Sequence, residues 1–580
     1  MALIGYGEAD FHSMVTRGLH FVDRTSFIAT QESLGSRNLL FTRPRRFGKS
    51  LWISVLQHYY DVRFKDEFAF LFGKYYIGQN PTPNRNNYIV LRIQFSGIDV
   101  STDERAYRGF RNNIKVGIID CMSNYPNFYT AQEVAQIASL SSPESMLQDF
   151  FGLHSSKKIP YKIYTLIDEY DHFANDLFTL DVERFQNIVS RTGFVRKSYE
   201  LIKNAMGEGI VDRNFMTGVA PLTVDAMTSG FNTVVHLSLD LGFHELMGFK
   251  KAEVETIMRL VGVTDALMPQ TMDDLTAWYD GYLFNTDATE RLYNSDMVMY
   301  FAGSYERWKK YPEKMLDINI ASDYTKVRKV FITNSKEDIH VPLLKKLTND
   351  GSVLAKITDL FNFELPFGQD DIVSLLFYMG WLTIEGKEAG YHAFKIPNHV
   401  IRELYYDYFV AISEQESQLN RAHGDISRAL FELATTNNPR PFLNLITALI
   451  EKRLSLRDAM NFDEKHLKML LIPYLSLSAS HYVTSEPEWQ NQYPDIVLLK
   501  RPNVPTKYNF VFELKYVKMA RKKNRTEEDD DKTLEKITDE ARQQLKAYLQ
   551  SDNAKRLDNL KAWLVILVGR KWQLIEEITA

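Results

Sequence analysis

The sequence predicts an α/β chain whose first domain is a mostly parallel sheet with helices on both faces. Through about residue 260, short apolar runs alternate with helical patterns, and that alternation is typical of parallel sheets. The pattern then becomes helical, and two apolar runs near the C-terminus each carry a carboxylate. We expect a sheet domain over residues 1–260, a helical lid over 261–330, a helical, winged-helix-like spacer over 331–440 and a second α/β domain over 441–580.

The expected strands of the first domain are short apolar runs, each followed by a polar segment. A continuous apolar run of this length is typical of a strand buried on both faces. The four runs are Asn38–Thr42, Tyr88–Phe95, Ile163–Ile167 and Phe215–Val219.

The first of these runs ends in a polar loop, and an amphipathic helix pattern follows the loop directly. The loop closes with Gly48, Lys49 and Ser50. A glycine lets the backbone approach a polyphosphate, the lysine reaches its outer phosphates, and the hydroxyl can bind Mg²⁺ at a helix N-terminus. The usual first glycine, five residues before Gly48, is replaced by Arg43. The loop is therefore either a phosphate-binding loop or a basic surface turn.

A second segment favours the phosphate-binding interpretation. The apolar run that ends at Ile167 is followed by Asp168 and Glu169. In phosphate-loop ATPases the first such carboxylate holds the Mg²⁺ shell and the second polarises the attacking water. Two carboxylates also end many ordinary strands, so the argument depends on their combination with the loop. We expect ATP and Mg²⁺ at this site.

The composition is that of a globular protein, with 45% hydrophobic and 25% charged residues and a net charge of −5 over 580 residues. Any contact with nucleic acid must therefore come from local basic patches. A single cysteine, Cys121, excludes an internal disulfide. The N-terminus lacks a secretory pattern, and no run approaches the roughly 20 apolar residues of a membrane span. We expect a cytoplasmic protein, or a nuclear one if the source is eukaryotic, with no membrane partner.

Several segments of the first half resemble the predicted AAA-ATPase-like family, whose members are often fused to a C-terminal nuclease-like domain. The resemblance implies that the missing glycine is a family trait, and that the arginines of the loop add charge around the phosphates. One difference is Ser295, where the family pattern has proline. The matching segments are residues 21–25, 43–50, 166–171, 216–219, 278–282 and 293–295, and the implied ATP-site residues are Arg43, Arg45, Arg46, Phe47, Gly48, Lys49, Ser50 and Asp168, with Glu169 as the base.

The middle of the chain resembles a winged-helix module, because a helix, a hairpin and a second helix follow one another. Such modules bind DNA in some proteins and serve as spacers in many ATPases. The expected wing carries two glutamates and one lysine between residues 385 and 388, which favours a spacer. The expected elements are a helix over 370–379, strands over 381–384 and 392–396, and a helix over 398–408.

Two strand-like runs near the C-terminus place carboxylates and a lysine together. Asp495 opens the first run, and Glu513 and Lys515 lie two residues apart on the second. Residues two apart on a strand point to the same face. Such a cluster can bind Mg²⁺ and orient a water beside a phosphodiester. The alternative is a solvated ion pair on an edge strand.

This cluster resembles the Pro-Asp…Asp/Glu-x-Lys nuclease superfamily, which has a restriction-endonuclease-like core of helix, three strands, helix and strand. The resemblance implies a first helix over 464–476, a later helix over 534–549 and a last strand over 562–568. It also implies a metal-site carboxylate at Glu464 and a glutamine of the later helix at Gln544, with Gln543 as the alternative.

We therefore expect an ATP-binding, ATP-hydrolysing domain coupled to a metal-dependent nuclease. Asp495, Glu513 and Glu464 would hold Mg²⁺ or Mn²⁺, and Lys515 would position the nucleophile or stabilise the pentacovalent phosphate. DNA is favoured over RNA as the nucleic-acid partner, and the oligomeric state is left open. One alternative is a regulatory NTPase switch whose C-terminal domain binds DNA or a protein without cleaving. Another is a degenerate ATPase that binds nucleotide only to hold its fold.

Overall fold

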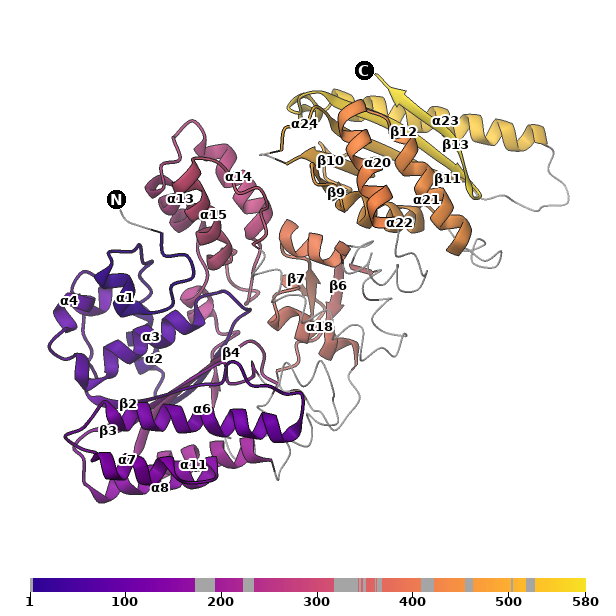
Figure 1. Cartoon of the computed structure of the whole chain (residues 1–580). Coiled ribbons are helices and arrows are strands. Elements are labelled where there is room, and N and C mark those ends of the chain that lie inside the picture. The colour runs from indigo at the N-terminus through magenta and orange to yellow at the C-terminus, as the bar shows by residue number, and fades with distance from the viewer. Residues whose placement is uncertain are drawn as a thin grey trace. The chain divides into compact units, whose positions relative to one another are not determined.

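The computed structural model describes most of the chain as two compact units, one built mainly from residues up to Val400 and one from Ile401 onward (Figure 1). The boundary between the units falls inside the expected spacer. The described residues are 4–172, 193–222, 234–317, 343, 346–347, 351–359, 361, 368–407, 422–453, 463–501, 504–517 and 527–579. The end of the expected lid and the start of the expected spacer, residues 318–342, lie outside them.

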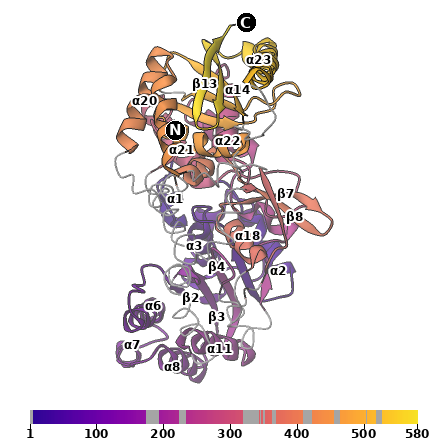
Figure 2. The same cartoon turned by 90° about the vertical axis from the view of Figure 1, so that its right-hand side faces the viewer.

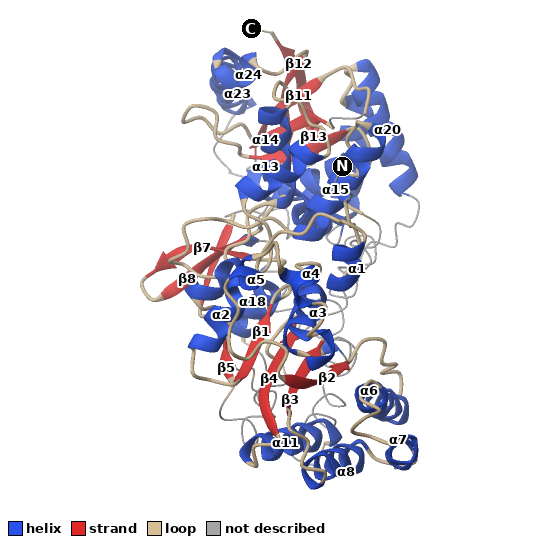
Figure 3. Cartoon of the chain, turned by 90° about the vertical axis from the view of Figure 1, so that its left-hand side faces the viewer, coloured by secondary structure: helices blue, strands red, loops and turns tan. Residues whose placement is uncertain are grey.

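The first unit contains a five-stranded parallel sheet in the order β2-β3-β4-β1-β5, drawn in red in Figure 3. All four expected strands are confirmed. β4 lies between β1, which leads into the loop, and β3, which ends in the two carboxylates. The strands are β1 (Asn38–Thr42), β2 (Tyr88–Gln94), β3 (Lys162–Asp168), β4 (Val211–Gly218) and β5 (Val235–His236).

Helices cover both faces of this sheet, as the sequence predicts. From β1 the chain crosses the sheet to β2 at the edge, and it then returns toward β1 through β3 and β4. Because crossovers between parallel strands are right-handed, the two directions place α3 on one face and the later helices on the other. Figure 1 shows this separation of α3 from α6, α8 and α11. Helices of the first 210 residues are α1 (Phe11–Thr16), α2 (Ser26–Ser33), α3 (Lys49–Tyr60), α4 (Phe68–Phe72), α5 (Tyr76–Gln79), α6 (Asp103–Ser123), α7 (Ala131–Ala138), α8 (Pro143–Ser156) and α11 (Phe194–Gly207), with a short 3-10 turn over Val62–Phe64.

The rest of the first unit is a helical segment and a small antiparallel sheet, both of which the sequence predicts. The hairpin of β7 and β8 follows α18 (Figure 2). The strand β6 pairs with β8 and completes the sheet in the order β6-β8-β7. Residues 399–407 form the helix expected after the hairpin, and the boundary between the two units falls within this helix, at Val400. The elements are a 3-10 turn over Leu241–Leu246, α13 (Lys251–Leu260), α14 (Met268–Tyr279), α15 (Ser295–Trp308), β6 (Ser352–Ala355), α18 (Gln369–Tyr378), β7 (Thr383–Glu388) and β8 (Tyr391–Lys395).

The second unit is a five-stranded mixed sheet in the order β13-β12-β11-β10-β9, in which only the β11–β12 pair is parallel. The expected succession of helix, three strands, helix and strand is confirmed, with β13 added at the edge. Its elements are α20 (Ala422–Thr436), α21 (Arg440–Arg453), α22 (Glu464–Ser476), β9 (His481–Ser485), β10 (Ile496–Lys500), β11 (Asn509–Val517), α23 (Glu527–Gln550), α24 (Asp552–Lys555), β12 (Leu560–Val568) and β13 (Lys571–Ile578).

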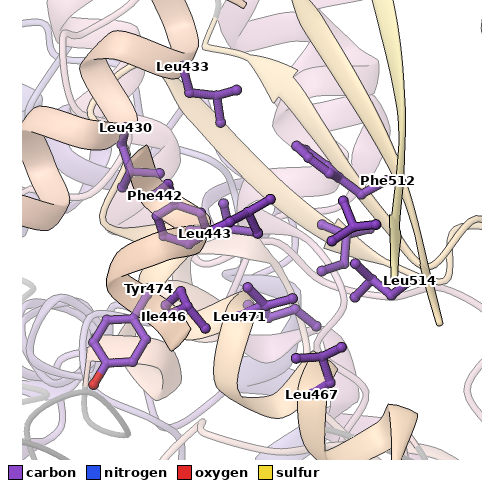
Figure 4. Close-up of a cluster of buried hydrophobic side chains, with 14 of the residues drawn as sticks. Leu430, Leu433, Phe442, Leu443, Ile446, Leu467, Leu471, Tyr474, Phe512 and Leu514 are labelled. Atoms are coloured by element: carbon purple, nitrogen blue, oxygen red, sulfur yellow. The ribbon is translucent and has the colours of Figure 1, made fainter. Parts of the chain in front are cut away.

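The two faces of this second sheet differ, and β11 contributes to both. Phe512 and Leu514 belong to a core that packs against α20, α21 and α22 (Figure 4). Val511 belongs to a separate core that packs against α23. Because successive side chains of a strand alternate, Glu513 and Lys515 lie on the Val511 face. The large core therefore occupies one face and the carboxylate cluster the other.

In the first unit, the turn after β3 is bound to the end of β4. Asp171 accepts hydrogen bonds from the backbone N–H groups of Val219 and Ala220, at 2.7–3.0 Å, and the Tyr170 hydroxyl donates to the carbonyl of Ala220 at 2.8 Å. A Cβ at Gly218 would lie 2.2 Å from Asp171 Oδ1 and 2.6 Å from the Tyr170 ring. Only glycine fits at this position without displacing its neighbours.

Gly218→Ala should therefore lower the free energy of unfolding of the first unit by roughly 1–3 kcal/mol, the usual cost of overpacking. Thermal unfolding measures the change. The control is Gly152→Ala on α8, where an added Cβ meets nothing within 4 Å and should stabilise the helix by up to about 1 kcal/mol. Equal midpoints for Gly218→Ala and the wild type would contradict the packing argument.

Candidate functional site

The loop between β1 and α3 forms the floor of a pocket of about 480 Å³ in the first unit. Gly48 adopts a left-handed φ of 96° and directly precedes α3, and no side chain caps the helix there. The first N–H groups of α3 are thus available to an anion. The loop residues that line the pocket are Arg45, Arg46, Phe47, Gly48, Lys49 and Ser50.

Lys49 lies at the centre of this loop. Its ammonium donates to the backbone carbonyls of Arg43 and Pro44, at 2.9 Å each. Burial lowers the pKa of Lys49 to about 8, and the carboxylates of Asp171, Glu169 and Asp168 oppose that shift. The lysine is therefore held by two neutral acceptors and attracted by three nearby acids.

Asp168 ends β3 with a buried carboxylate. Neither oxygen accepts a hydrogen bond that meets normal geometry. Burial raises the pKa of Asp168, while the nearby Ser50 hydroxyl, Arg92 and Lys49 oppose the rise. A buried carboxylate without a donor is costly unless a cation compensates it. A magnesium ion between Ser50 and Asp168 fits this arrangement.

Glu169 extends into the pocket from a strained backbone, because its φ is 53° in the left-handed region. A non-glycine residue in that region is often found at a functional site. His172 Nδ1 lies 3.4 Å from Glu169 Oε2, and His172 lines the pocket too. His172 was not predicted from the sequence, although its spacing of three residues from Glu169 was visible there.

Arg43 differs from the expectation that it surrounds the phosphates, since its side chain does not line the pocket. The guanidinium is buried and donates to the carbonyls of Thr42, Ser238, Phe243 and His244, at 2.6–3.2 Å. The geometry indicates a structural role for this side chain. Arg45 and Arg46 do line the pocket.

The segment that begins with Asn294 and Ser295 supports the loop from the side. The Ser295 hydroxyl and the Asp296 N–H both donate to the carbonyl of Arg46, at 3.2 and 3.3 Å. Asn294 donates from its amide to the carbonyl of Arg45 at 3.4 Å. The contact is made without the proline of the family pattern, because it depends on the Ser295 side chain and on backbone groups.

The Phe47 side chain links the loop to the aromatic segment that includes Tyr282. The Phe47 ring meets the rings of Tyr282 and Phe284 edge-on, with centroids 5.0 and 5.6 Å apart. The aromatic segment thus contributes to the site by fixing the loop in place.

A second cluster lies in the C-terminal unit, where the structure brings together Asp495, Glu513, Lys515 and Glu464. Lys515 Nζ lies 2.7 Å from Glu513 Oε1 and 3.7 Å from Glu464 Oε2. Asp495 Oδ2 accepts a hydrogen bond from the N–H of Leu514 at 2.7 Å. The other Glu513 oxygen, Oε2, is buried and accepts no hydrogen bond of normal geometry, although the Tyr548 hydroxyl lies near this carboxylate.

Both candidate glutamines of α23 reach this cluster. Gln543 and Gln544 line a cavity of about 650 Å³ together with Glu464 and Lys515. Adjacent helix positions are about 100° apart, so two neighbours can border one broad groove. The choice between Gln543 and Gln544 therefore stays open.

Lys468 is a residue of this cluster that was not predicted from the sequence. Its ammonium forms ion pairs with Asp495 Oδ1 and, at 2.7 Å, with Glu486 Oε1. Lys468 follows Glu464 by four residues on α22, so the two share a helix face. That spacing was the available signal in the sequence.

Within the described residues, no three His, Cys, Asp or Glu side chains are grouped closely enough to hold a metal ion. The two lysines lie between the C-terminal carboxylates and neutralise part of their charge. The donor set still fits a divalent cation, because it offers carboxylate oxygens and the unbonded Glu513 Oε2.

The pKa of Glu513 predicts how metal binding depends on pH. Burial and then the charge of Asp495 raise this pKa from 4.5 to about 7. Because the folded value exceeds the unfolded one, Glu513 stabilises the metal-free unit at low pH, and this stabilisation is lost as the pH rises from about 4.5 to 7. A metal must displace the proton of Glu513 in the folded protein, so Mn²⁺ affinity should increase as the pH rises toward about 7 and then level off.

Isothermal titration calorimetry of the nucleotide-free chain, with Mn²⁺ at a series of pH values, measures that dependence. Glu513→Gln should bind Mn²⁺ weakly at every pH and show little of the increase. An affinity of the wild type that stays constant across this window would contradict the assignment of the pKa to Glu513.

Comparisons with known proteins match two segments of the chain to known families. Residues 5–228 match the family described as "Predicted AAA-ATPase", and residues 462–577 match the PD-(D/E)XK nuclease superfamily. The chain is also similar to an uncharacterized protein in the vnfD 5' region of Azotobacter chroococcum mcd 1, at 25% identity over 288 residues. That match covers 49% of this chain and 48% of the relative, so the chain spans about half the length of the curated relative it matches.

No solved structure matches the chain significantly. Among the described residues, no helix combines the length and the apolar character that crossing a bilayer requires.

Proposed function

Because the chain joins a predicted AAA-ATPase domain to a domain of the PD-(D/E)XK nuclease superfamily, we propose that it hydrolyses ATP in the first domain and cuts nucleic acid in the second. The observation that carries the proposal is that both sites keep a buried carboxylate with an unbonded oxygen, at Asp168 and at Glu513. DNA is the proposed substrate in preference to RNA.

At the first site, the proposed roles follow from the contacts of the loop residues and of the residues at the end of β3. Lys49 exchanges its two carbonyl acceptors for the outer phosphates of ATP. Ser50 and Asp168 would hold Mg²⁺, and the ion would supply positive charge beside the phosphates. Glu169 accepts a hydrogen bond from the attacking water, with His172 beside its carboxylate. Arg45 and Arg46 add positive charge at the rim of the pocket.

Lys49→Ala should weaken ATP binding at least about tenfold, because it removes a charge-assisted contact to the phosphates. Glu169→Gln should keep ATP binding and slow hydrolysis by roughly 100-fold, the lower range for loss of a general base. Calorimetry and phosphate release measure the two effects, and the exposed Lys65→Ala and Glu208→Gln serve as controls. Undiminished ATP affinity in folded Lys49→Ala would exclude the phosphate-loop role.

At the second site, the proposed chemistry is metal-dependent hydrolysis of a phosphodiester. Mg²⁺ or Mn²⁺ held by Asp495, Glu513 and Glu464 would polarise the phosphate and lower the pKa of a bound water. Lys515, 2.7 Å from Glu513, would orient that water or stabilise the charge that develops on the phosphate. Gln544 or Gln543 would contact the substrate from α23.

Asp495→Asn and Lys515→Ala should each lower cleavage by roughly 100-fold or more, and Asp495→Asn should keep nucleic-acid binding. The assay compares single- and double-stranded DNA and RNA with Mg²⁺ or Mn²⁺, with and without ATP. Glu535→Gln, exposed on α23, is the matched control. Cleavage that survives in Asp495→Asn would refute the assignment of the metal site.

A regulatory switch is the second candidate function, and the ion pairs of the C-terminal lysines with Asp495 and Glu513 favour it. In that function, ATP turnover changes an interaction of the C-terminal domain, which binds DNA or a protein without cutting. ATP hydrolysis by wild-type protein, together with no cleavage of any nucleic acid tested, would support the switch over the nuclease.

A further inference from the structure

We propose that Lys468 is a counter-cation of the C-terminal site. To bind there, a divalent metal must displace the Lys468 ammonium group from Asp495, and the ammonium group then pairs with Glu486 alone. The inference rests on the proposed nuclease function and adds a step to it. In the metal-free protein, the positive charge of Lys468 would offset the repulsion between the clustered carboxylates. In the metal-bound protein, Lys468 would form an ion pair with Glu486 alone.

Both oxygens of Asp495 are already occupied. Oδ1 forms an ion pair with Lys468, and Oδ2 accepts the hydrogen bond from the N–H of Leu514. The Asp495 side chain is only 8% exposed and that of Lys468 only 11%. A metal ion that approaches Asp495 therefore meets a buried ammonium group at the oxygen it needs, and two cations cannot share that oxygen without strong repulsion.

Glu486 gives the displaced ammonium a second partner. It lies across the β9–β10 hairpin from Asp495, since the N–H of Glu486 donates to the carbonyl of Asp495 at 3.2 Å. Its carboxylate already contacts Lys468 at 2.7 Å and is half exposed. Lys468 can therefore leave Asp495 by a small rotation and keep one ion pair.

The charges of the cluster support the same exchange. Glu464, Glu486, Asp495 and Glu513 carry four negative charges when ionised, and the ammonium groups of Lys468 and Lys515 carry two positive ones. The sum of −2 equals the charge that one divalent cation neutralises. Without Glu486 the sum would be −1, and a metal would leave the buried site positive.

The test is calorimetric titration of the full-length, nucleotide-free chain with Mn²⁺ alone. Heat that Asp495→Asn removes is assigned to the C-terminal site. Lys468→Met should bind Mn²⁺ roughly tenfold more tightly or better, because it removes a competing charge a few ångströms away. Lys468→Arg should stay near the wild-type affinity, and Lys465→Met, exposed on the same helix, should not change it.

Glu486→Gln gives a second, independent readout. This variant keeps Lys468 but removes its alternative partner, so the ammonium should hold Asp495 more firmly and Mn²⁺ should bind more weakly than to the wild type. In the double variant with Lys468→Met, the effect of Glu486→Gln should largely disappear, since no lysine remains to redirect. A merely structural role for either residue would not produce this coupling.

The outcomes separate this inference from the nuclease proposal. Unchanged or weaker Mn²⁺ binding in Lys468→Met, in a chain whose wild type binds Mn²⁺ and cleaves nucleic acid, overturns the counter-cation role and leaves the nuclease intact. Binding that appears only after Lys468→Met supports the role. Absence of Mn²⁺ binding and of cleavage in every variant overturns both.

Discussion

The loop between β1 and α3 depends on a buried positive charge. The Arg43 guanidinium lies 4.3 Å from the centre of the Phe41 ring and 4.0 Å from that of Phe284, and it donates to four backbone carbonyls. Without such acceptors a buried cation would be strongly destabilising. Because the acceptors come from β1 and from residues 238–244, the same side chain that replaces the usual glycine joins the start of the loop to a distant part of the unit.

The loop also receives support from the winged-helix-like module within the same unit. Gly380, at a φ of 81°, lies so close to Pro44 that an added Cβ would come within 2.7 Å of the proline ring. Gly281 approaches the module even more closely, since a Cβ added there would lie 2.2 Å from the carbonyl oxygen of Pro397. The module therefore contacts the loop itself and packs against Pro44.

Local patterns were enough to predict the strands, the turn from β1 into α3 and the shared face of Glu513 and Lys515, because each depends on neighbours in sequence. The position of β4 between β1 and β3 depends on crossover connections, which local patterns do not specify. The role of Arg43 was missed because its acceptors lie about 195 to 201 residues away. Lys468 was missed because its partners belong to a hairpin that only the fold brings to α22.

The alternation along β11 bears on how this domain tolerates change over evolution. Phe512 and Leu514 face the large core, while Glu513 and Lys515 face the opposite side. Substitutions can alter one face without the other. Loss or gain of a single residue inside the strand, however, would turn Glu513 and Lys515 toward the large core and Phe512 and Leu514 toward the face of the carboxylate cluster. The site is therefore inherited together with the strand register, and length variation in related chains should fall in the loops that flank β11.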